Sequence, residues 1–241
     1  QTIAVPPLSA PDLTELRRAA DLNWSAIDVS IFGTLFERGL DPAKRSQLGA
    51  HYTDPATIRR LIEPVIERPL RGDWEREAAV LSALMAKSTR KGDKHHRAAR
   101  ERFVRWLERL KAYRVLDPAC GSGNFLFVGL KALKDIEHRC HLDAAALGLD
   151  READLVTGPH NVLGIELNEY AAELARVTVW IGELQWRLAH GYPFKTNPVL
   201  EPLDHIECRD ALVTFASPAE PGMGSDRDVA QPNSRSDPNA G

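Results

Sequence analysis

The stretch Tyr113-Arg-Val-Leu-Asp117-Pro-Ala-Cys-Gly121-Ser-Gly123-Asn-Phe125 decides the fold class of this 241-residue chain. It begins as a short apolar strand that ends on an acid, and continues as a turn with two glycines that opens an apolar helix. The glycines allow the backbone to turn sharply and to approach a ligand closely, and the first N–H groups of the helix have no partner within it. The pattern therefore predicts a strand–turn–helix unit that binds a nucleotide-type cofactor.

Two positions indicate which cofactor this unit takes. A dinucleotide-binding loop has a third glycine, which would fall at position 126, where this chain has Leu126. Asp117 at the end of the strand would repel a pyrophosphate but attract a cation. S-adenosylmethionine carries a sulfonium and an α-ammonium group, so it suits this site. An oxidoreductase that uses a dinucleotide is the less favoured alternative, and a binding comparison with NAD would test it.

Two further segments extend the pattern to a sheet. The apolar run Val162-Leu-Gly-Ile-Glu166 is typical of a buried parallel strand, and Ile206-Glu-Cys-Arg-Asp210 gives a weaker strand signal. Between them, residues 170–191 have apolar residues at intervals of three and four and end on a glycine, which predicts a crossover helix. Alternating strands and helices predict an open, doubly wound parallel sheet, with its ligand at the carboxyl ends of the strands.

The spacing between the two acids departs from that of a dinucleotide fold. The acid of the second strand there follows the glycine loop by about 20 residues, whereas Glu166 follows Asp117 by 49. We expect an insertion, over about 137–160, that forms an extra helix and a loop on one face of the sheet. Without further information, Glu166 and Asp210 are also compatible with ordinary acids at strand ends or turns.

The segment 117–125 resembles the cofactor loop, motif I, of amino-group DNA methyltransferases, in particular the adenine-specific enzymes of fused restriction–modification systems. Three more stretches match this family in the same order: Gly49-Ala-His-Tyr-Thr53-Asp-Pro before the loop, Val162-Leu-Gly-Ile-Glu166-Leu-Asn in the second strand, and Ile206-Glu-Cys-Arg-Asp210-Ala-Leu in the third. The resemblance implies an α/β fold: a partial doubly wound, Rossmann-like methyltransferase sheet, preceded by an α-helical N-terminal region.

The resemblance also implies a cofactor site for S-adenosylmethionine. Glu166 would bind the ribose and Asp210 the adenine ring, and a helix beginning at Asp54-Pro55 would receive the methionine carboxylate. The alternative for this helix is a capped surface helix with no ligand. The implied cofactor-binding residues are Tyr52, Thr53, Asp117, Pro118, Ala119, Cys120, Gly121, Gly123, Asn124, Phe125, Glu166, Leu167, Asp210 and Ala211.

The catalytic motif of the family is missing from the sequence. Those enzymes hold the target amine with an Asn or Asp followed by Pro-Pro and an aromatic residue, and Asn197-Pro198-Val-Leu lacks the second proline and the aromatic residue. The chain also begins with Gln. We expect a truncated piece of an adenine N6 methyltransferase that binds S-adenosylmethionine weakly and does not methylate DNA alone. The alternative is a non-catalytic cofactor- or DNA-binding module of a restriction–modification system.

Composition and charge set the remaining expectations. With 43% hydrophobic residues and a net charge of −3, we expect a helical N-terminal region over 1–112, an incomplete α/β core over 113–216 and a disordered, Pro- and Gly-rich tail over 217–241. The N-terminal region includes an expected helix over 27–36. No segment has the length and hydrophobicity of a membrane span or a secretion signal, so we expect a cytoplasmic location.

One segment is strongly basic. Residues 87–114 contain eleven Lys or Arg and three acids, and within it a predicted helix over 97–111 carries Arg102, Arg105 and Arg109 beside an apolar stripe. This helix is a candidate contact for double-stranded DNA, although a solvated basic helix explains it as well. The cluster His138-Arg-Cys140-His141 lacks the spacing of a metal site, so we predict no metal.

Overall fold

The computed structural model describes residues 7–21, 31, 53–150, 154–192 and 202–213. The chain divides into two units, Gln1–Ala211 and Leu212–Gly241, and the elements below belong to the first. Helix α1 (Ala10–Ala20) begins with a capping box in which Ser9 and Asp12 exchange hydrogen bonds, and none of its residues is buried. Tyr52, the tail over 217–241 and all of the expected helix over 27–36 except Ile31 lie outside the described residues.

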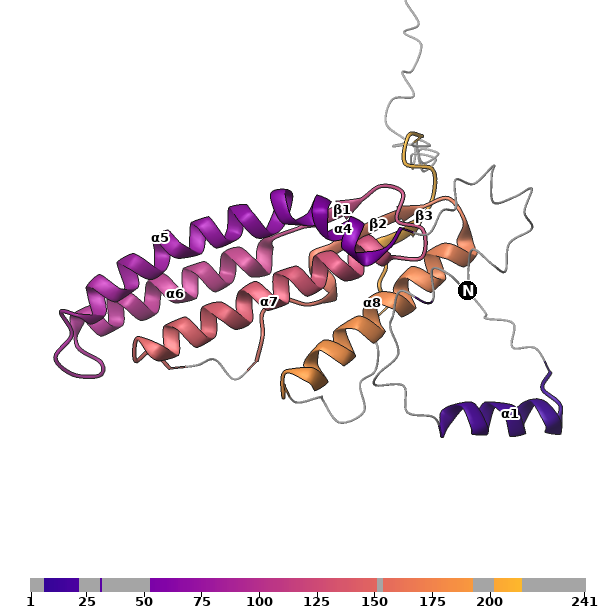
Figure 1. The fold of residues 1–241 in the computed structure, drawn as a ribbon, viewed down its shortest axis with the longest axis horizontal. Coiled ribbons are helices and arrows are strands. Elements are labelled where there is room, and N and C mark those ends of the chain that lie inside the picture. Colours follow the sequence, from indigo (N-terminus) through magenta and orange to yellow (C-terminus); the bar gives the residue numbers. More distant parts are fainter. Residues whose placement is uncertain (1–6, 22–30, 32–52, 151–153, 193–201, 214–241) are drawn as a thin grey trace, which may run out of the picture. The chain divides into compact units, whose positions relative to one another are not determined.

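A parallel sheet of three strands forms the expected α/β core (Figure 1). Its strands are β1 (Val115–Asp117), β2 (Val162–Glu166) and β3 (Ile206–Cys208), in the spatial order β1-β2-β3. Asp117 is level with Gly164, and Glu166 is level with Cys208. All three strands therefore end at the same edge of the sheet, which confirms the predicted fold class.

Two long helices connect these strands. Helix α7 (Asn124–Ala146) follows β1, and α8 (Glu169–Ala189) follows β2, in agreement with the predicted crossover helix. Leu126 and Leu130 of α7 pack with Val179 of α8 and Ile206 of β3 in one buried cluster. The sheet and both helices are thus held by a single apolar layer.

The segment 137–160, expected to be an insertion with an extra helix and a loop, has a different structure. Its first part contains no separate helix, because α7 continues without a break to Ala146. The described part of the rest is a loop that ends in the short 3₁₀ helix η3 (Pro159–Asn161). Glu137 fixes this loop by accepting hydrogen bonds from the backbone N–H groups of Val156 at 2.7 Å and Thr157 at 2.8 Å. A long α7 and a pinned return loop account for the wide spacing of the two acids.

The helices that precede the sheet form one run with a proline in its middle. Helix α4 (Pro55–Ile62) leads through the π-helical turn η2 (Glu63–Glu67) into α5 (Arg68–Met85). Pro64 has no N–H to donate and crowds the carbonyl four residues earlier, so the chain widens locally instead of continuing a regular α-helix. Helix α6 (Lys94–Ala112) then returns alongside α5.

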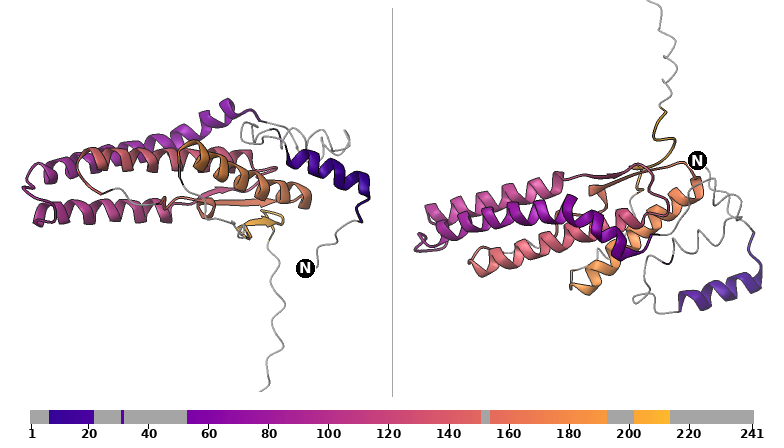
Figure 2. Two further views of the ribbon diagram at one scale, coloured as in Figure 1. Left: turned by 90° about the horizontal axis from the view of Figure 1, so that it is seen from below. Right: turned by 45° about the horizontal axis from the view of Figure 1, so that its top comes forward.

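These helices lie alongside α7 (Figure 2) and share a buried core with it. The fully or nearly fully buried residues of this cluster include Ile58 of α4, Leu81 of α5, Phe103 of α6 and Leu133 of α7. At the end of α6, the buried Asn161 donates hydrogen bonds to the carbonyls of Leu110 at 3.0 Å and Tyr113 at 2.8 Å. The helical region and the sheet are therefore joined by packing and by a buried side chain.

The predicted basic helix is α6, but two of its three highlighted arginines are neutralised by α5. Arg102 forms two hydrogen bonds with Glu77, at 2.5 and 3.1 Å, and Arg109 pairs with Asp73. These pairs fasten α6 to α5, which leaves Arg105 without an acidic partner among the described residues. Over the same residues, no helix is both long enough and apolar enough to cross a membrane.

Candidate cofactor site

The glycine turn after β1 is anchored to the neighbouring strand. The backbone N–H of Cys120 donates to the carbonyl of Ile165 at 3.0 Å, and the N–H of Gly123 donates to the carbonyl of Cys120 at 2.8 Å. Gly121 and Gly123 have φ values of 53° and 87°, a left-handed backbone that residues with a Cβ rarely adopt. The turn is thus a rigid loop at the carboxyl edge of the sheet.

The two glycines have different surroundings. A Cβ placed on Gly121 would meet no atom within 4 Å, whereas one placed on Gly123 would lie 2.9 Å from the Cα of Ala175 in α8. Gly164 of β2 is confined in the same way, since a Cβ there would lie 2.9 Å from the Sγ of Cys120. Gly123 and Gly164 therefore serve packing, and Gly121 is the position that leaves open space for a ligand.

Glu166 holds the turn from the end of β2. Its carboxylate accepts a hydrogen bond from the N–H of Gly121 at 2.8 Å and another from the N–H of Asn168 at 2.9 Å. Each carboxylate oxygen has about two lone-pair directions and uses one of them here. Glu166 can therefore accept further hydrogen bonds from a ligand such as a ribose while it positions the loop.

Asp117 lies beside Glu166 at the same edge. One of its oxygens accepts a hydrogen bond from the N–H of Ala119 at 3.1 Å. Burial raises the pKa of Asp117 above its ordinary value. The hydrogen bond from Ala119 lowers this pKa by less than burial raises it, and the charge of the neighbouring Glu166 adds a still smaller increase. Within the described residues neither carboxylate is paired with Lys, Arg or His. Among the described residues the loop therefore concentrates negative charge without an ion-pair partner.

The other residues of the loop differ in their exposure. Pro118 and Ala119 are exposed, Phe125 is half-buried, and Asn124 is buried with no hydrogen-bond partner for its Oδ1 among the described residues. Burial, with the nearby Asp117 and Glu166 charges, raises the pKa of Cys120 to about 12. A thiol with this pKa stays protonated at neutral pH, so Cys120 acts as a small packing residue.

The start of α4 does not offer the free N–H groups that the sequence led us to expect. Asp54 accepts hydrogen bonds from the N–H groups of Ala56 and Thr57, both at 3.0 Å, and from the Thr57 hydroxyl at 2.6 Å. The side chain of Asp54 thus occupies the place where a ligand carboxylate would bind. Thr53 is half-buried next to this cap, and its predicted partner Tyr52 lies outside the described residues.

The third strand brings its candidate residues near the same edge without enclosing them. Asp210 and Ala211 lie just beyond β3 and are exposed, as is Leu167 just beyond β2. The N–H of Arg209 donates to the carbonyl of Glu166 at 3.0 Å, which ties the end of β3 to the end of β2. Asp117, Glu166 and Asp210 therefore follow neighbouring strand ends, as the alternation of elements predicted.

The structure adds residues that the motifs did not reveal. Asn168 caps α8 by accepting a hydrogen bond from the N–H of Ala171 at 3.0 Å, and its position directly before a helix was a readable signal. Lys134 and Glu183 form a fully buried ion pair at 2.8 Å between α7 and α8, and Arg187 joins it by donating to Glu183 at 2.6 Å. No local pattern marks such a pair, because its members lie 49 positions apart.

The residues of the rejected metal cluster each have a separate partner. His138 contacts the hydroxyl of Tyr192 at 2.9 Å, the Sγ of Cys140 accepts from the indole of Trp106 at 3.2 Å, and His141 lies 3.2 Å from Glu137. Among the described residues no group of three or more His, Cys, Asp or Glu is arranged to hold a metal ion.

Comparison with known proteins identifies relatives of this chain. Residues 91–215 match the family model described as "MmeI, DNA-methyltransferase domain". DNA methyltransferase A of Bacillus subtilis (strain 168) is 26% identical over 219 residues, which cover 85% of this chain and 22% of that protein. A solved structure of the type IIL restriction–modification enzyme MmeI in complex with DNA superimposes with a TM-score of 0.67 at 27% identity and covers 85% of this chain and 26% of that one.

The chain thus spans about a quarter or less of the length of these two relatives. The family match covers more than half of the chain and includes all three strands and the glycine turn. Sequence and structural likeness agree on the same kind of protein, a methyltransferase of the restriction–modification type. The chain belongs to the family of the MmeI DNA-methyltransferase domain.

Proposed function

We propose that this chain is the cofactor-binding part of a DNA methyltransferase that transfers the methyl group of S-adenosylmethionine to the N6 amine of adenine. The observation that carries the proposal is the pair of carboxylates at the carboxyl edge of the sheet. Glu166 holds the glycine turn through the N–H of Gly121, Asp117 lies beside it, and neither has a cationic partner among the described residues. Such a site favours a cation and disfavours a pyrophosphate.

The cofactor would supply an electrophilic methyl group, and the chain would supply its orientation. In this proposal Glu166 accepts the ribose hydroxyls, Asp117 faces the positively charged methionine end, and Asp210 with Leu167 and Ala211 borders the adenine ring. Gly121 leaves space for close approach of the ligand. Because Asp54 caps α4, we do not assign the methionine carboxylate to the start of that helix.

Double-stranded DNA is the proposed substrate, and the cytoplasm is the proposed place of action. The names of the relatives support DNA as the substrate, since one is a DNA methyltransferase and the other was solved in complex with DNA. The 241 residues do not contain an Asn or Asp followed by Pro-Pro and an aromatic residue. This motif would hold the target amine in line with the methyl group. We therefore propose that the chain alone binds the cofactor without transferring the methyl group.

Calorimetric titration with S-adenosylmethionine tests the site. Glu166→Gln replaces one accepting oxygen with a donor and removes a charge-assisted hydrogen bond, worth about 1.5–3 kcal/mol. We therefore expect a loss of affinity of about tenfold or more. Glu169→Gln is the matched control, because Glu169 is an exposed acid three positions away at the start of α8. Equal affinities of the two variants, or saturation of the wild-type chain by NAD in place of S-adenosylmethionine, would contradict the proposed site.

An assay for the transfer of labelled methyl groups to duplex DNA tests the proposal that the chain alone does not methylate DNA. The purified chain should give no incorporation under conditions in which it is saturated with the cofactor. Incorporation would refute the proposal that the chain alone is inactive and would leave the cofactor site standing.

A further inference from the structure

Helices α4 and α7 line an open hollow of about 560 Å³. Pro55 and Ala56 of α4 and Phe127 and Val128 of α7 form its apolar part, and the charged residues around it are Arg59, Arg60, Glu63 and Lys131. Arg59 and Arg60 are exposed, and Lys131 is half-buried. A concave surface thus gathers three cations within two turns of the start of each helix.

These cations are not neutralised by the chain that the structure describes. Glu63, the acid at this hollow, lies 3.3 Å from Arg68 instead, and with the residues that the structure describes Arg59, Arg60 and Lys131 form no ion pair or side-chain hydrogen bond. Three like charges held close together repel one another, so an arrangement of this kind favours an anionic ligand.

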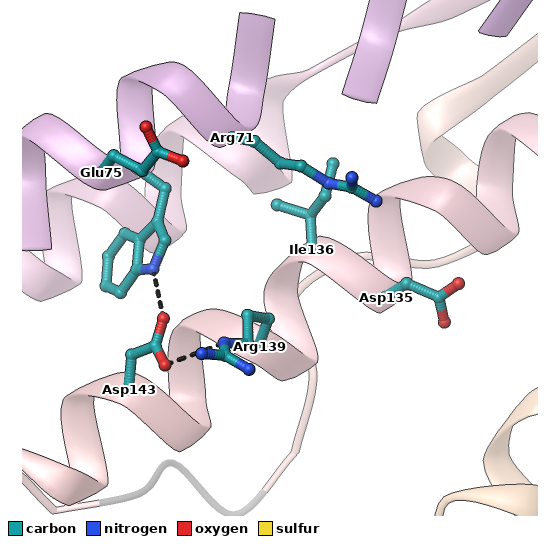
Figure 3. A pocket seen from close by; sticks show the side chains of 7 residues that line it. Arg71, Glu75, Asp135, Ile136, Arg139 and Asp143 are labelled. Carbon is teal, nitrogen blue, oxygen red and sulfur yellow. Dashed lines mark hydrogen bonds and ion pairs between the residues drawn. The ribbon is translucent and has the colours of Figure 1, made fainter. Parts of the chain in front are cut away.

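A second hollow shows the contrast (Figure 3). It measures about 410 Å³ and lies between α5 and α7, and it also has two arginines at its border. There Arg139 pairs with Asp143 at 2.9 Å, and Arg71 pairs with Glu67 at 2.7 Å. Its positive charges are already compensated, so of these two hollows the one between α4 and α7 is better suited to an anion.

The position of the cations indicates the class of anion. Helix α7 begins at the carboxyl edge of the sheet, and Lys131 follows its first residue, Asn124, by seven positions, which places it about 10 Å along the axis. Helix α6 leads into the opposite, amino end of β1, so its cations lie away from that edge. A nucleic acid whose base reaches a cofactor at the carboxyl edge has its backbone near that edge, and α7 begins there.

We propose that Arg59, Arg60 and Lys131 form a surface that binds phosphates of a DNA backbone next to the cofactor loop. The inference rests on the proposed function and assigns the substrate contact to α4 and α7 instead of the basic helix α6. Phosphate contacts of this kind fix the position of a duplex and carry no sequence information. The surface therefore orients DNA over the site without choosing the target sequence.

The salt dependence of DNA binding by the full 241-residue chain tests the proposal. Each phosphate neutralised by the protein contributes about 0.9 to the slope of log affinity against log salt concentration. Fluorescence anisotropy with a labelled duplex should show that the combined variant Arg59→Gln, Arg60→Gln and Lys131→Gln has a slope smaller in magnitude by about 2–3. The single variant Arg60→Gln, with an expected change of about 1, gives the answer if the combined variant does not fold.

The matched control removes three exposed cations from α6: Lys94→Gln, Arg97→Gln and Arg105→Gln. It changes the net charge equally, and we expect it to leave the slope close to that of the wild-type chain. A smaller slope in the α6 variant than in the α4–α7 variant would overturn the inference, as would absence of salt-dependent DNA binding by the wild-type chain. If inorganic phosphate competes at this surface but the three substitutions leave the DNA slope unchanged, the surface binds free anions and the inference also fails.

Titration with S-adenosylmethionine separates this inference from the proposed function. The α4–α7 variant should bind the cofactor like the wild-type chain, because its substitutions lie outside the proposed cofactor residues. A wild-type chain that binds DNA with the expected slope but no cofactor would contradict the proposed function and retain the phosphate surface. The opposite result is a wild-type chain that binds the cofactor, with a salt slope of DNA binding that is the same in the α4–α7 variant. It would contradict the phosphate surface and retain the proposed function.

Discussion

Alanine substitutions at the two glycines of the turn provide a test. We expect Gly123→Ala to lose more stability and Gly121→Ala to lose more cofactor affinity. Gly121→Ala introduces a Cβ at a φ of 53° into open space, and Gly123→Ala introduces one at a φ of 87° against α8. The nearest atoms at Gly123 are the Cα, Cβ and carbonyl oxygen of Ala175, at 2.9, 3.0 and 3.1 Å. Two of these atoms belong to the backbone of a helix and cannot move away independently.

The expected free energies of unfolding follow from this geometry. The left-handed conformation alone costs a residue with a Cβ about 1 kcal/mol, which is the whole expected loss for Gly121→Ala. Gly123→Ala adds the displacement of α8, an overpacking cost of about 2 kcal/mol, for a total of about 3 kcal/mol. Adding Ala175→Gly should recover little of this loss, because it removes one of the three close atoms.

Equilibrium unfolding in urea measures the difference. With a slope of about 2 kcal/mol per molar, a gap of about 2 kcal/mol separates the two midpoints by about 1 M. Among the folded variants, Gly121→Ala should lose more cofactor affinity than Gly123→Ala, because the methyl group added at position 121 enters the space left for the ligand. Equal losses of stability, or a larger loss for Gly121→Ala, would show that contact with α8 does not dictate the glycine at 123.

Three further predictions concern buried polar groups. Because the pKa of Asp117 is raised, acidification from neutral pH should protonate this carboxyl before an ordinary one and weaken binding of S-adenosylmethionine. In Asp117→Asn the affinity should depend less on pH. Calorimetry at several pH values measures both. Asn161→Ala should lower the free energy of unfolding by about 2–3 kcal/mol, because three backbone carbonyls lose a donor. His160→Ala at the exposed neighbouring position removes one hydrogen bond to the backbone of Lys111 and should cost less, about 1 kcal/mol. Chemical denaturation compares the two variants. Glu183→Gln should lower the free energy of unfolding by about 3–5 kcal/mol, because Lys134 would keep a buried charge without its partner. An unchanged midpoint of thermal unfolding would contradict this role of the pair.

Local sequence patterns were sufficient to predict the parallel sheet and the edge of the sheet at which the candidate residues Asp117 and Glu166 lie. The apolar runs before Asp117 and within 162–166, with a periodic helix between the second and third strands, predicted three parallel strands that the structure contains. The strand ends then placed Asp117 and Glu166 at one edge, because parallel strands run in the same direction. These features follow from periodicity and from turn residues, which are properties of neighbouring positions.

Features that depend on partners far apart in the chain were beyond the sequence. The basic stripe of α6 suggested contact with DNA, yet Arg102 and Arg109 meet acids of α5 that lie 25 and 36 positions away. The arginines were compatible with two roles, and the spatial neighbour decided between them. The start of α4 is a local case, in which the sequence left open a capped helix and an anion site, and the structure shows that Asp54 accepts hydrogen bonds from the N–H groups of Ala56 and Thr57.

The amino-acid sequence by itself determined the strand–turn–helix unit, the parallel order of the strands and the acids at their ends, because short-range periodicity, glycine and chain direction fix these. Only the tertiary structure decided that Glu166 holds the turn through Gly121, that Gly123 is confined by the contact with Ala175, and that Arg59, Arg60 and Lys131 gather at one hollow between α4 and α7. The physical reason is that hydrogen bonds, close contacts and charge pairing depend on distances between atoms, and residues 45 positions apart acquire such distances only when the helices and strands pack.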